Sequence, residues 1–206
     1  DWGWRLLVPD RPGFGQSPSR GPDDMEADAE WLTAHLDEGT HLIGHSFGGA
    51  VALLAAARRP SSVRSLILIE PALVPLLIDS KELRSDVAAR EAFLGMIQSW
   101  VKTRTPADYA RALMQNLGVA PVANGAAPGE GGALDEQRAA AVGCAFLRAR
   151  MATPAALKQA ALTVAEAGIP VLVVTGGWSP IFEAVGNIAA DLTGGRYAVV
   201  PAPHHF

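Results

Sequence analysis

The stretch that decides the fold is HLIGHSFGGAVALLAAARRP, residues 41–60. A short apolar run leads into residues 44–48, GHSFG, and an alanine-rich helical stripe follows at once. A strand, a sharp turn and a helix in this order predict a Gly-x-Ser-x-Gly nucleophile elbow. The turn strains the backbone of Ser46, so small residues at Gly44 and Gly48 let the strand and the helix approach each other. We therefore expect an exposed Ser46 hydroxyl at a helix N-terminus, where backbone N–H groups favour negative charge.

A plainer interpretation of the same residues is a serine that caps a helix on a glycine-rich turn. That interpretation does not require an apolar strand directly before the turn. The strand context therefore favours a nucleophile at Ser46.

Further apolar runs outside the elbow predict a sheet. Together with the run that precedes the elbow they are RLLVP (5–9), THLIGH (40–45), VRSLILIE (63–70), IPVLVVTG (169–176) and RYAVVP (196–201). Most of them lack apolar/polar alternation, which is typical of parallel strands covered by helices on both faces. We expect two of the covering helices at residues 24–38, capped by Asp23 or Asp24, and at residues 47–59.

A long segment without a strand signal separates two of these runs. Residues 75–168 carry helical stripes and the helix-opening pairs Thr105-Pro106 and Thr153-Pro154. This is far more chain than one crossover needs. We predict an α/β fold with a mostly parallel sheet, whose core (1–74 and 169–206) is interrupted by a helical lid insertion (75–168).

Composition narrows the classes of partner. The 206 residues are 49% hydrophobic and 18% charged, enough for one sizeable core. The net charge of −4 and the dispersed lysines and arginines give no footprint for nucleic acid or an anionic membrane. No apolar run reaches the roughly 18 residues of a membrane span. We expect a small-molecule substrate, and the sequence leaves the oligomeric state open.

The first residues carry an expectation about the parent protein. The chain begins at Asp1 without a methionine and enters RLLVP almost at once, so we expect an internal piece of a longer protein. The absence of a signal peptide therefore leaves the compartment undetermined. The single cysteine, Cys144, excludes an intramolecular disulfide and a cysteine-based zinc site, and it favours the cytoplasm.

Three motifs together resemble the α/β-hydrolase fold superfamily over nearly the whole chain. They are DRPGFGQS (10–17), GHSFGG (44–49) and APHHF (202–206). The resemblance implies that Ser46 is the nucleophile and that His205, after the last strand, is its base; His204 is the alternative. His45 commonly accompanies the motif and is expected to pack beside the site without transferring a proton.

The acid is the point at which this sequence departs from the family. The family usually carries an aspartate in G-x-x-D after the strand that matches VLVVTG, but residues 176–179 read GGWS. Ser179 is better interpreted as a helix cap before Pro180. A glutamate at the end of the preceding strand is similar to the acid of haloalkane dehalogenases, which use Asp rather than Ser as nucleophile. We therefore predict Glu70 as the orienting acid.

Three alternatives to this prediction remain. Glu70 is, on the plainer interpretation, a water-exposed residue at a strand end. Glu183 and Asp79 are the other candidate acids.

Trp178, in the loop after its strand, is a candidate wall of the substrate pocket, and His45 is assigned to the same surface.

The oxyanion of a tetrahedral intermediate needs backbone donors. We expect one from the N–H of Phe47. In the family the other follows a strand upstream of RLLVP, which this chain does not contain. The family also places that strand between the matches of RLLVP and THLIGH. We therefore expect a gap or an unusual pairing in the sheet, and poor folding or inactivity of the chain alone.

Residues 10–17 are interpreted as structural. Gly13 and Gly15 suit tight turns, and Asp10 and Arg11 are expected to form local hydrogen bonds or an ion pair. The pair of glycines lacks the third glycine and the helix start of a dinucleotide fingerprint. No Walker motif, H-E-x-x-H or metal-spaced carboxylate cluster occurs, so we expect no cofactor and no metal.

These residues predict a serine hydrolase that cleaves an ester-type bond of a small, apolar substrate through an acyl-enzyme. Ser46, His205 and Glu70 would form its catalytic triad. One alternative is a non-catalytic binding protein of the same fold, which the missing aspartate supports. Another keeps the triad for C–C bond hydrolysis, perhydrolysis or acyl transfer, because members of one fold differ in the pocket.

Overall fold

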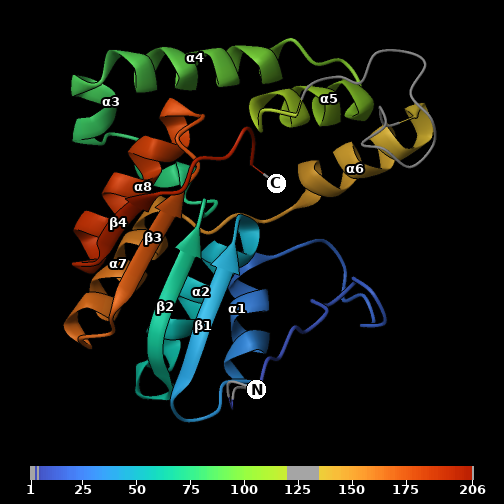
Figure 1. Ribbon diagram of the computed structural model, residues 1–206. Coiled ribbons are helices and arrows are strands. Elements are labelled where there is room, and N and C mark those ends of the chain that lie inside the picture. The colour runs from blue at the N-terminus through green and yellow to red at the C-terminus, as the bar shows by residue number, and fades with distance from the viewer. Residues whose placement is uncertain (1–2, 4, 120–134, 206) are drawn as a thin grey trace.

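The fold is built on one parallel sheet, which the computed structural model shows together with its helices (Figure 1). The structure describes residue 3 and residues 5–119 and 135–205. Four strands lie in the order β1-β2-β3-β4, with bounds Thr40–His45, Val63–Ile69, Val171–Thr175 and Arg196–Val199. Every neighbouring pair is parallel, so the carboxyl ends of the strands meet at one edge. The predicted α/β class with a parallel sheet is confirmed.

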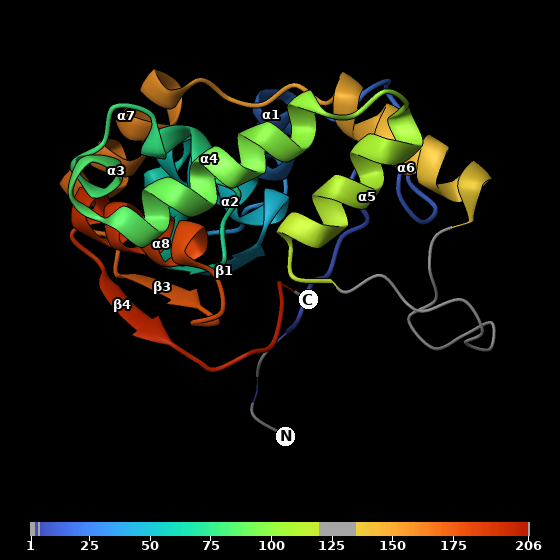
Figure 2. The same cartoon turned by 90° about the horizontal axis from the view of Figure 1, so that it is seen from above.

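One layer of helices covers one face of the sheet. Its members are α1 (Met25–Thr33), α2 (Phe47–Arg58), α7 (Pro154–Glu166) and α8 (Pro180–Thr193). Helix α2 packs on β1 and β2 and α8 packs on β3, while α1 and α7 flank α2. Figure 2 shows this layer on one side of the strands.

The opposite face differs from the expectation of helices on both faces. Among the described residues the sheet is covered on one face only. Along β1 the side chains alternate, so that Leu42 is buried towards α2 while Ile43 is 58% exposed. The apolar sequence of this strand therefore does not mean that both of its faces are buried.

The main core lies between the sheet and the helix layer. Leu53 of α2, Leu66 and Leu68 of β2, and Val173 of β3 are completely buried there. Burying one such side chain contributes about 1.5–3 kcal/mol before entropy is counted. This core holds the strand ends in a fixed register.

Helix starts follow the predicted capping chemistry. The Asp24 side chain accepts from the N–H groups of Glu26 and Ala27 at the start of α1. Thr105 and Thr153 cap the helices that begin at the prolines after them. The α1 helix ends at Thr33, earlier than the predicted residue 38, because the chain continues in tighter i to i−3 turns.

The segment between β2 and β3 is helical in its described residues. Besides α7 it contains η2 (Val74–Leu77), α3 (Lys81–Ser85), α4 (Val87–Val101), α5 (Pro106–Asn116) and α6 (Glu136–Arg148), and a short η1 (Pro60–Ser62) precedes β2. In Figure 1 α4 and α5 lie beyond the carboxyl ends of the strands. The division into a core and a 75–168 insertion stays a prediction.

Helices α5 and α6 pack against each other at backbone distance. A Cβ atom on Gly143 would lie 1.7 Å from the carbonyl oxygen of Pro106. Three buried alanines, Ala107, Ala110 and Ala139, form a small core of their own between the two helices. This helix pair is therefore held together by small residues rather than by the main core.

The first predicted strand is absent, so that prediction was wrong. Residues 5–9 have no strand structure, and Leu6, Leu7 and Val8 are 83%, 60% and 79% exposed. A strand requires a hydrogen-bonded neighbour, and none of the four described strands pairs with this segment. The sheet therefore runs from β1 to β4 without the expected gap.

In the part of the chain that the structure describes, no helix has both the length and the apolar character that crossing a bilayer requires.

Candidate active site

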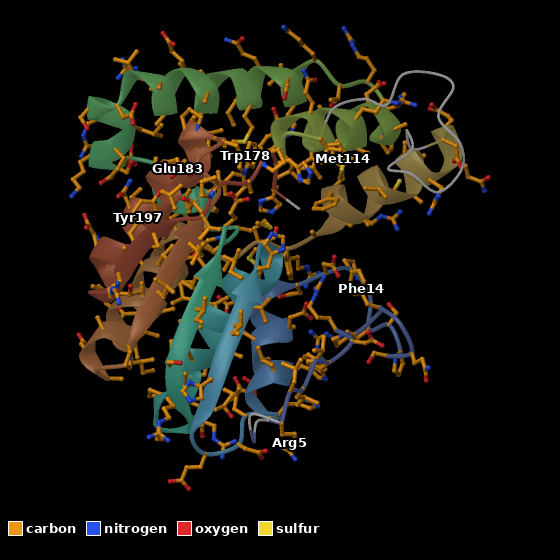
Figure 3. The ribbon with its side chains drawn as sticks, in the orientation of Figure 1. Arg5, Phe14, Met114, Trp178, Glu183 and Tyr197 are labelled. Atoms are coloured by element: carbon orange, nitrogen blue, oxygen red, sulfur yellow. The ribbon has the colours of Figure 1, made fainter. Side chains whose placement is uncertain are left out.

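The predicted site residues gather at the carboxyl edge of the sheet. Ser46 follows β1, Glu70 follows β2 and His205 comes after β4. The N–H of Ser46 donates to the carbonyl of Ile69 at 3.0 Å, so the turn after β1 remains tied to the end of β2. Figure 3 shows Trp178 at the same edge, on the side where α4 and α5 lie.

The backbone of Ser46 has the strained geometry of a nucleophile elbow. Its φ is 54° and its ψ is −124°, a combination that side-chain-bearing residues rarely adopt. Ser46 occupies the N-cap position of α2, but its hydroxyl makes no capping hydrogen bond. The plainer interpretation, a helix-capping serine, is thus not supported by the geometry.

The glycines of the elbow act partly as expected. A Cβ on Gly44 would lie 2.4 Å from the carbonyl oxygen of Gly48, so only glycine fits there. Gly48 itself faces open space, and the predicted steric reason fails at this position. The second position that must be glycine for steric reasons is Gly49, because a Cβ there would lie 2.9 Å from the Cβ of Pro71. The close approach is therefore between α2 and the residue that follows Glu70.

His205 and Glu70 form a buried pair. Nδ1 of His205 lies 2.7 Å from Oε2 of Glu70, and the two side chains are 1% and 5% exposed. A carboxylate only accepts hydrogen bonds, so Nδ1 carries the proton and Nε2 is left as the acceptor. Burial lowers the pKa of His205, the hydrogen bond with Glu70 opposes this shift, and nearby His45 adds to it. At neutral pH the imidazole is therefore in the form that can accept a proton.

The other oxygen of Glu70 is held by the loop after β3. Oε1 accepts from the N–H of Gly176 at 2.8 Å and from Nε1 of Trp178 at 2.7 Å. Trp178 was predicted as a pocket wall, and its contact with the acid was not anticipated. The available signal was a donor-bearing side chain in the loop where the family usually carries its acid.

His45 lies beside His205, and Phe182 packs there as well. Nε2 of His45 donates to the carbonyl of His205 at 2.8 Å, and the two ring centroids are 4.7 Å apart. The ring of Phe182, from α8, is centred 4.6 Å from that of His205; sequence reasoning did not single it out. His204 is half-buried, and the structure brings His205 rather than His204 to Glu70.

The alternative acids are not the partners of His205 in this structure. Glu183 accepts from Thr175 Oγ1 at 2.8 Å and from the Tyr197 hydroxyl, and its other oxygen accepts from the N–H of Gly177 at 2.9 Å. Figure 3 labels Glu183 and Tyr197 in this cluster. Burial, with Glu183 as a hydrogen-bond partner, raises the pKa of Tyr197 to about 12. Asp79 lies in the turn before α3 with a φ of 61°.

Phe47, the predicted oxyanion donor, packs against the arginine of a partly buried ion pair. The Arg11 guanidinium lies 4.5 Å from the centroid of the Phe47 ring and 4.4 Å from that of Phe14. Its Nη1 is 2.5 Å from Oδ2 of Asp28, whose side chain is 3% exposed and also pairs with Arg20. The local role expected for Arg11 therefore extends to the residue beside the nucleophile.

A metal interpretation was weighed for the same residues. Potential ligand atoms of His45, Glu70 and His205 lie within 4.8 Å of one another. Those residues already bond to each other through the Glu70–His205 contact and the His45 contact to the His205 carbonyl. The polar atoms of this cluster are therefore engaged with one another within the protein.

Comparison with known families agrees with the geometry. The sequence matches the family described as alpha/beta hydrolase fold over residues 1–206. The chain belongs to the alpha/beta hydrolase family. The resemblance inferred from the three motifs is thereby confirmed.

Curated relatives match parts of this chain. A pimeloyl-[acyl-carrier protein] methyl ester esterase from Neisseria meningitidis is 45% identical over 65 residues, which cover 32% of this chain and 25% of the esterase. The lipase LipV from Mycobacterium tuberculosis is 39% identical over 88 residues, covering 41% of this chain and 33% of the lipase. The chain thus spans a third or less of the length of these relatives.

Solved structures match nearly the whole chain at low identity. A 2-hydroxy-6-oxo-6-phenylhexa-2,4-dienoate hydrolase from a Rhodococcus species has a TM-score of 0.55 and 17% identity, with 94% of this chain and 70% of that chain covered. A variant haloalkane dehalogenase from Agrobacterium tumefaciens has a TM-score of 0.51 and 18% identity, covering 94% and 71%. At this identity the likeness shows the fold.

Proposed function

We propose that this hydrolase cleaves an ester bond of a small, apolar substrate through an acyl-enzyme on Ser46. The observation that carries the proposal is the buried pair of His205 and Glu70, 2.7 Å apart, at the sheet edge that also presents the strained Ser46. The partial matches to an esterase and a lipase support ester substrates.

The first half of the proposed reaction transfers the acyl group to the enzyme. Oγ of Ser46 attacks the ester carbonyl while Nε2 of His205 takes the hydroxyl proton. The N–H of Phe47 donates to the oxyanion of the tetrahedral intermediate. The intermediate collapses, the ester C–O bond breaks, and the alcohol leaves with the proton from His205.

The second half releases the acid. A water molecule loses a proton to Nε2 of His205 and attacks the acyl carbonyl. Collapse of this second intermediate breaks the bond to Ser46 Oγ, which recovers its proton from His205. The enzyme returns to its starting state, and no cofactor or change of oxidation state is involved.

Glu70 serves both halves without becoming protonated. Its carboxylate accepts a hydrogen bond from the Nδ1–H of His205, which fixes the tautomer in which Nε2 is the proton acceptor. When His205 is protonated during the reaction, the Glu70 charge stabilises the imidazolium.

The alternatives lose their specific support. The non-catalytic interpretation depended on the missing family aspartate, and the hydrogen bond between Glu70 and His205 supports an orienting acid at another position. C–C bond hydrolysis, perhydrolysis and acyl transfer would use the same triad. The names of the sequence relatives favour ester hydrolysis over these other reactions.

We further propose that the helices of residues 75–168 cover the substrate pocket. Helices α4 and α5 lie beyond the strand ends, and the carbonyl of Leu117, after α5, accepts from the N–H of His205 at 3.1 Å. A cover at this edge would exclude water from the acyl-enzyme until hydrolysis.

Labelling by a fluorophosphonate tests the proposal directly. The intact natural protein, Ser46→Ala and Glu70→Gln are incubated with the reagent and examined by mass spectrometry. A single adduct on Ser46, absent in the first variant and greatly slowed in the second, is expected. Hydrolysis of p-nitrophenyl esters of increasing acyl length then tests the apolar preference. No adduct and no ester hydrolysis by the folded natural protein would overturn the proposal.

A further inference from the structure

Both oxygens of the Glu70 carboxylate accept hydrogen bonds, one from His205 and the other from the loop after β3. Oε2 faces Nδ1 of His205, whereas Oε1 receives two donors from the loop, the N–H of Gly176 and the indole N–H of Trp178. A carboxylate whose two oxygens are bonded on opposite sides cannot rotate without losing a hydrogen bond. The indole therefore fixes the plane in which Glu70 meets the base.

A second glutamate anchors this loop from its other side. The N–H of Gly177 donates to Oε1 of Glu183 at 2.9 Å, next to the Gly176 N–H that donates to Glu70. Consecutive amides of the loop thus point to two different carboxylates. This arrangement fixes the backbone that carries Trp178.

The residues that follow α5 contact Trp178 and the backbone that carries His205. A Cβ on Gly118 would lie 3.0 Å from Cε3 and Cζ3 of the Trp178 indole and 3.3 Å from the Cα of His204. The carbonyl of Leu117 accepts from the N–H of His205 at 3.1 Å. One turn of chain therefore supports the indole that holds Glu70 and the backbone that carries the base.

We propose that Trp178 is a positioning residue for Glu70 and that Leu117 and Gly118 hold it in place, so that the helical segment ending at α5 sets the geometry of the triad. This inference rests on the proposed function and adds a role for residues outside the triad. Trp178 acts through Glu70 and does not take part in the proton transfers.

Removal of the indole N–H has a defined electrostatic effect. The donor withdraws negative charge from the Glu70 carboxylate. In Trp178→Phe more of that charge is directed at His205, so the pKa of its imidazole should rise. His45 and Glu70, the ionisable groups that interact with His205, are unchanged in this variant. The freed carboxylate also loses its fixed plane, and kcat should fall about 10-fold or more, the usual worth of a hydrogen bond to a charged group.

Gly118→Ala tests the same contact from the opposite side, without altering the indole. The new methyl group would push on the Trp178 ring and displace it from Oε1. Gly168→Ala is the matched control: Gly168 follows α7 as Gly118 follows α5, and their φ values are 67° and 74°. Nothing lies within 4 Å of a Cβ on Gly168, so Gly168→Ala introduces only the backbone strain of a side chain at positive φ and no new contact.

The experiment measures kcat and KM for a p-nitrophenyl ester and titrates the His205 imidazole by NMR. The expected result is a lower kcat, an unchanged KM and a raised His205 pKa in Trp178→Phe and in Gly118→Ala. Trp31→Phe, on α1, and Gly168→Ala should match the natural protein. A purely structural role for Trp178 would lower stability but leave the imidazole pKa unchanged.

Two outcomes separate this inference from the proposed function. If the natural protein hydrolyses esters and both variants equal their controls in kcat and in His205 pKa, the positioning role is overturned while the proposed function stands. If the natural protein hydrolyses no ester, the proposed function fails, and the NMR titration still decides whether Trp178 sets the Glu70–His205 pair. Should Trp178→Phe fail to fold, Gly118→Ala and its control carry the test.

Discussion

The imidazole of His205 and the carboxylate of Glu70 meet at 2.7 Å although 135 residues separate them along the chain. Both residues come after strands of the parallel sheet. Because β2 pairs with β3 and β3 with β4, the sheet brings the segments that carry the two residues to the same edge. Hydrogen bonds from Gly176 and Trp178 to Glu70, and from the His205 N–H to the carbonyl of Leu117, then hold the pair in place.

Glu70→Gln should inactivate the enzyme while leaving it folded. The loop donors, Gly176 and Trp178, would bind the amide oxygen and turn the NH₂ group towards His205. The imidazole would then carry its proton on Nε2, the wrong tautomer for a base. The comparable change in a serine protease lowers kcat about 10⁴-fold, and steady-state kinetics would measure the loss. Glu183→Gln is the control and should lose far less activity. Equal losses of activity in the two variants would contradict the assignment of Glu70 as the acid.

The pH profile should show a base with a depressed pKa. The acid limb of kcat/KM reports the free-enzyme base. Burial lowers the pKa of His205, so the limb should lie below the ordinary histidine value of about 6.5. Glu70→Gln removes the partner that opposes this shift and should move the limb lower still. An acid limb above that ordinary value would contradict the assignment of His205.

The same shift makes stability depend on pH. The folded protein binds the His205 proton less readily than the unfolded chain does. The stability that the neutral His205 contributes to the folded protein is therefore fully present above the unfolded pKa of about 6.5, and it is lost as the pH falls through the folded pKa. Urea unfolding of the natural protein and of His205→Gln at neutral and mildly acid pH would measure the difference. An equal pH dependence in the two proteins would exclude His205 as its source.

Asp28→Ala should destabilise the protein more than any exposed charge change. The substitution leaves Arg11 and Arg20 without their shared buried carboxylate. Because Arg11 and Arg20 are 23% and 36% exposed, the loss of unfolding free energy should be about 1–3 kcal/mol, the cost of losing a hydrogen bond to a charged group, and is measurable by denaturant titration. Asp37→Ala, which breaks the exposed pair with Arg5, is the control and should change little. Similar losses would show that the Asp28 cluster is no more than a surface feature.

Ser46→Gly should be more stable than Ser46→Ala although both are inactive. The positive φ of 54° disfavours any side chain and suits glycine. Relief of this strain should raise the unfolding free energy of the glycine variant by about 1 kcal/mol over the alanine variant. Denaturant midpoints of the two variants provide the comparison. A less stable glycine variant would show that the elbow is not strained.

The sequence predicted best what depends on neighbouring residues. The elbow at Ser46, the Asp24 cap and the Thr105-Pro106 helix start are each written within a few positions of the chain. The order of apolar runs also predicted the parallel sheet. These features need no knowledge of distant contacts.

Predictions that depend on a partner elsewhere in the fold were less secure. The RLLVP run has the composition of a strand, but no described strand pairs with it. Gly49, not Gly48, makes the close approach, because the neighbour is Pro71 from another strand end. The contact of Trp178 with Glu70 spans 108 residues and has no local signature. The roles of the site residues and the domain boundaries stay predictions until the experiments above are done.

The small alanine core between α5 and α6 also bears on how such an enzyme can diversify. Because Gly143 packs on Pro106 apart from the main core, this helix pair can be exchanged for another without rebuilding the sheet. Its tie to the chemistry is narrow, through Leu117 and Gly118 alone among the contacts described above. A grafted helix pair that preserves this short junction would inherit the reaction and bring its own substrate preference, which makes the junction the natural splice point for building chimeric enzymes.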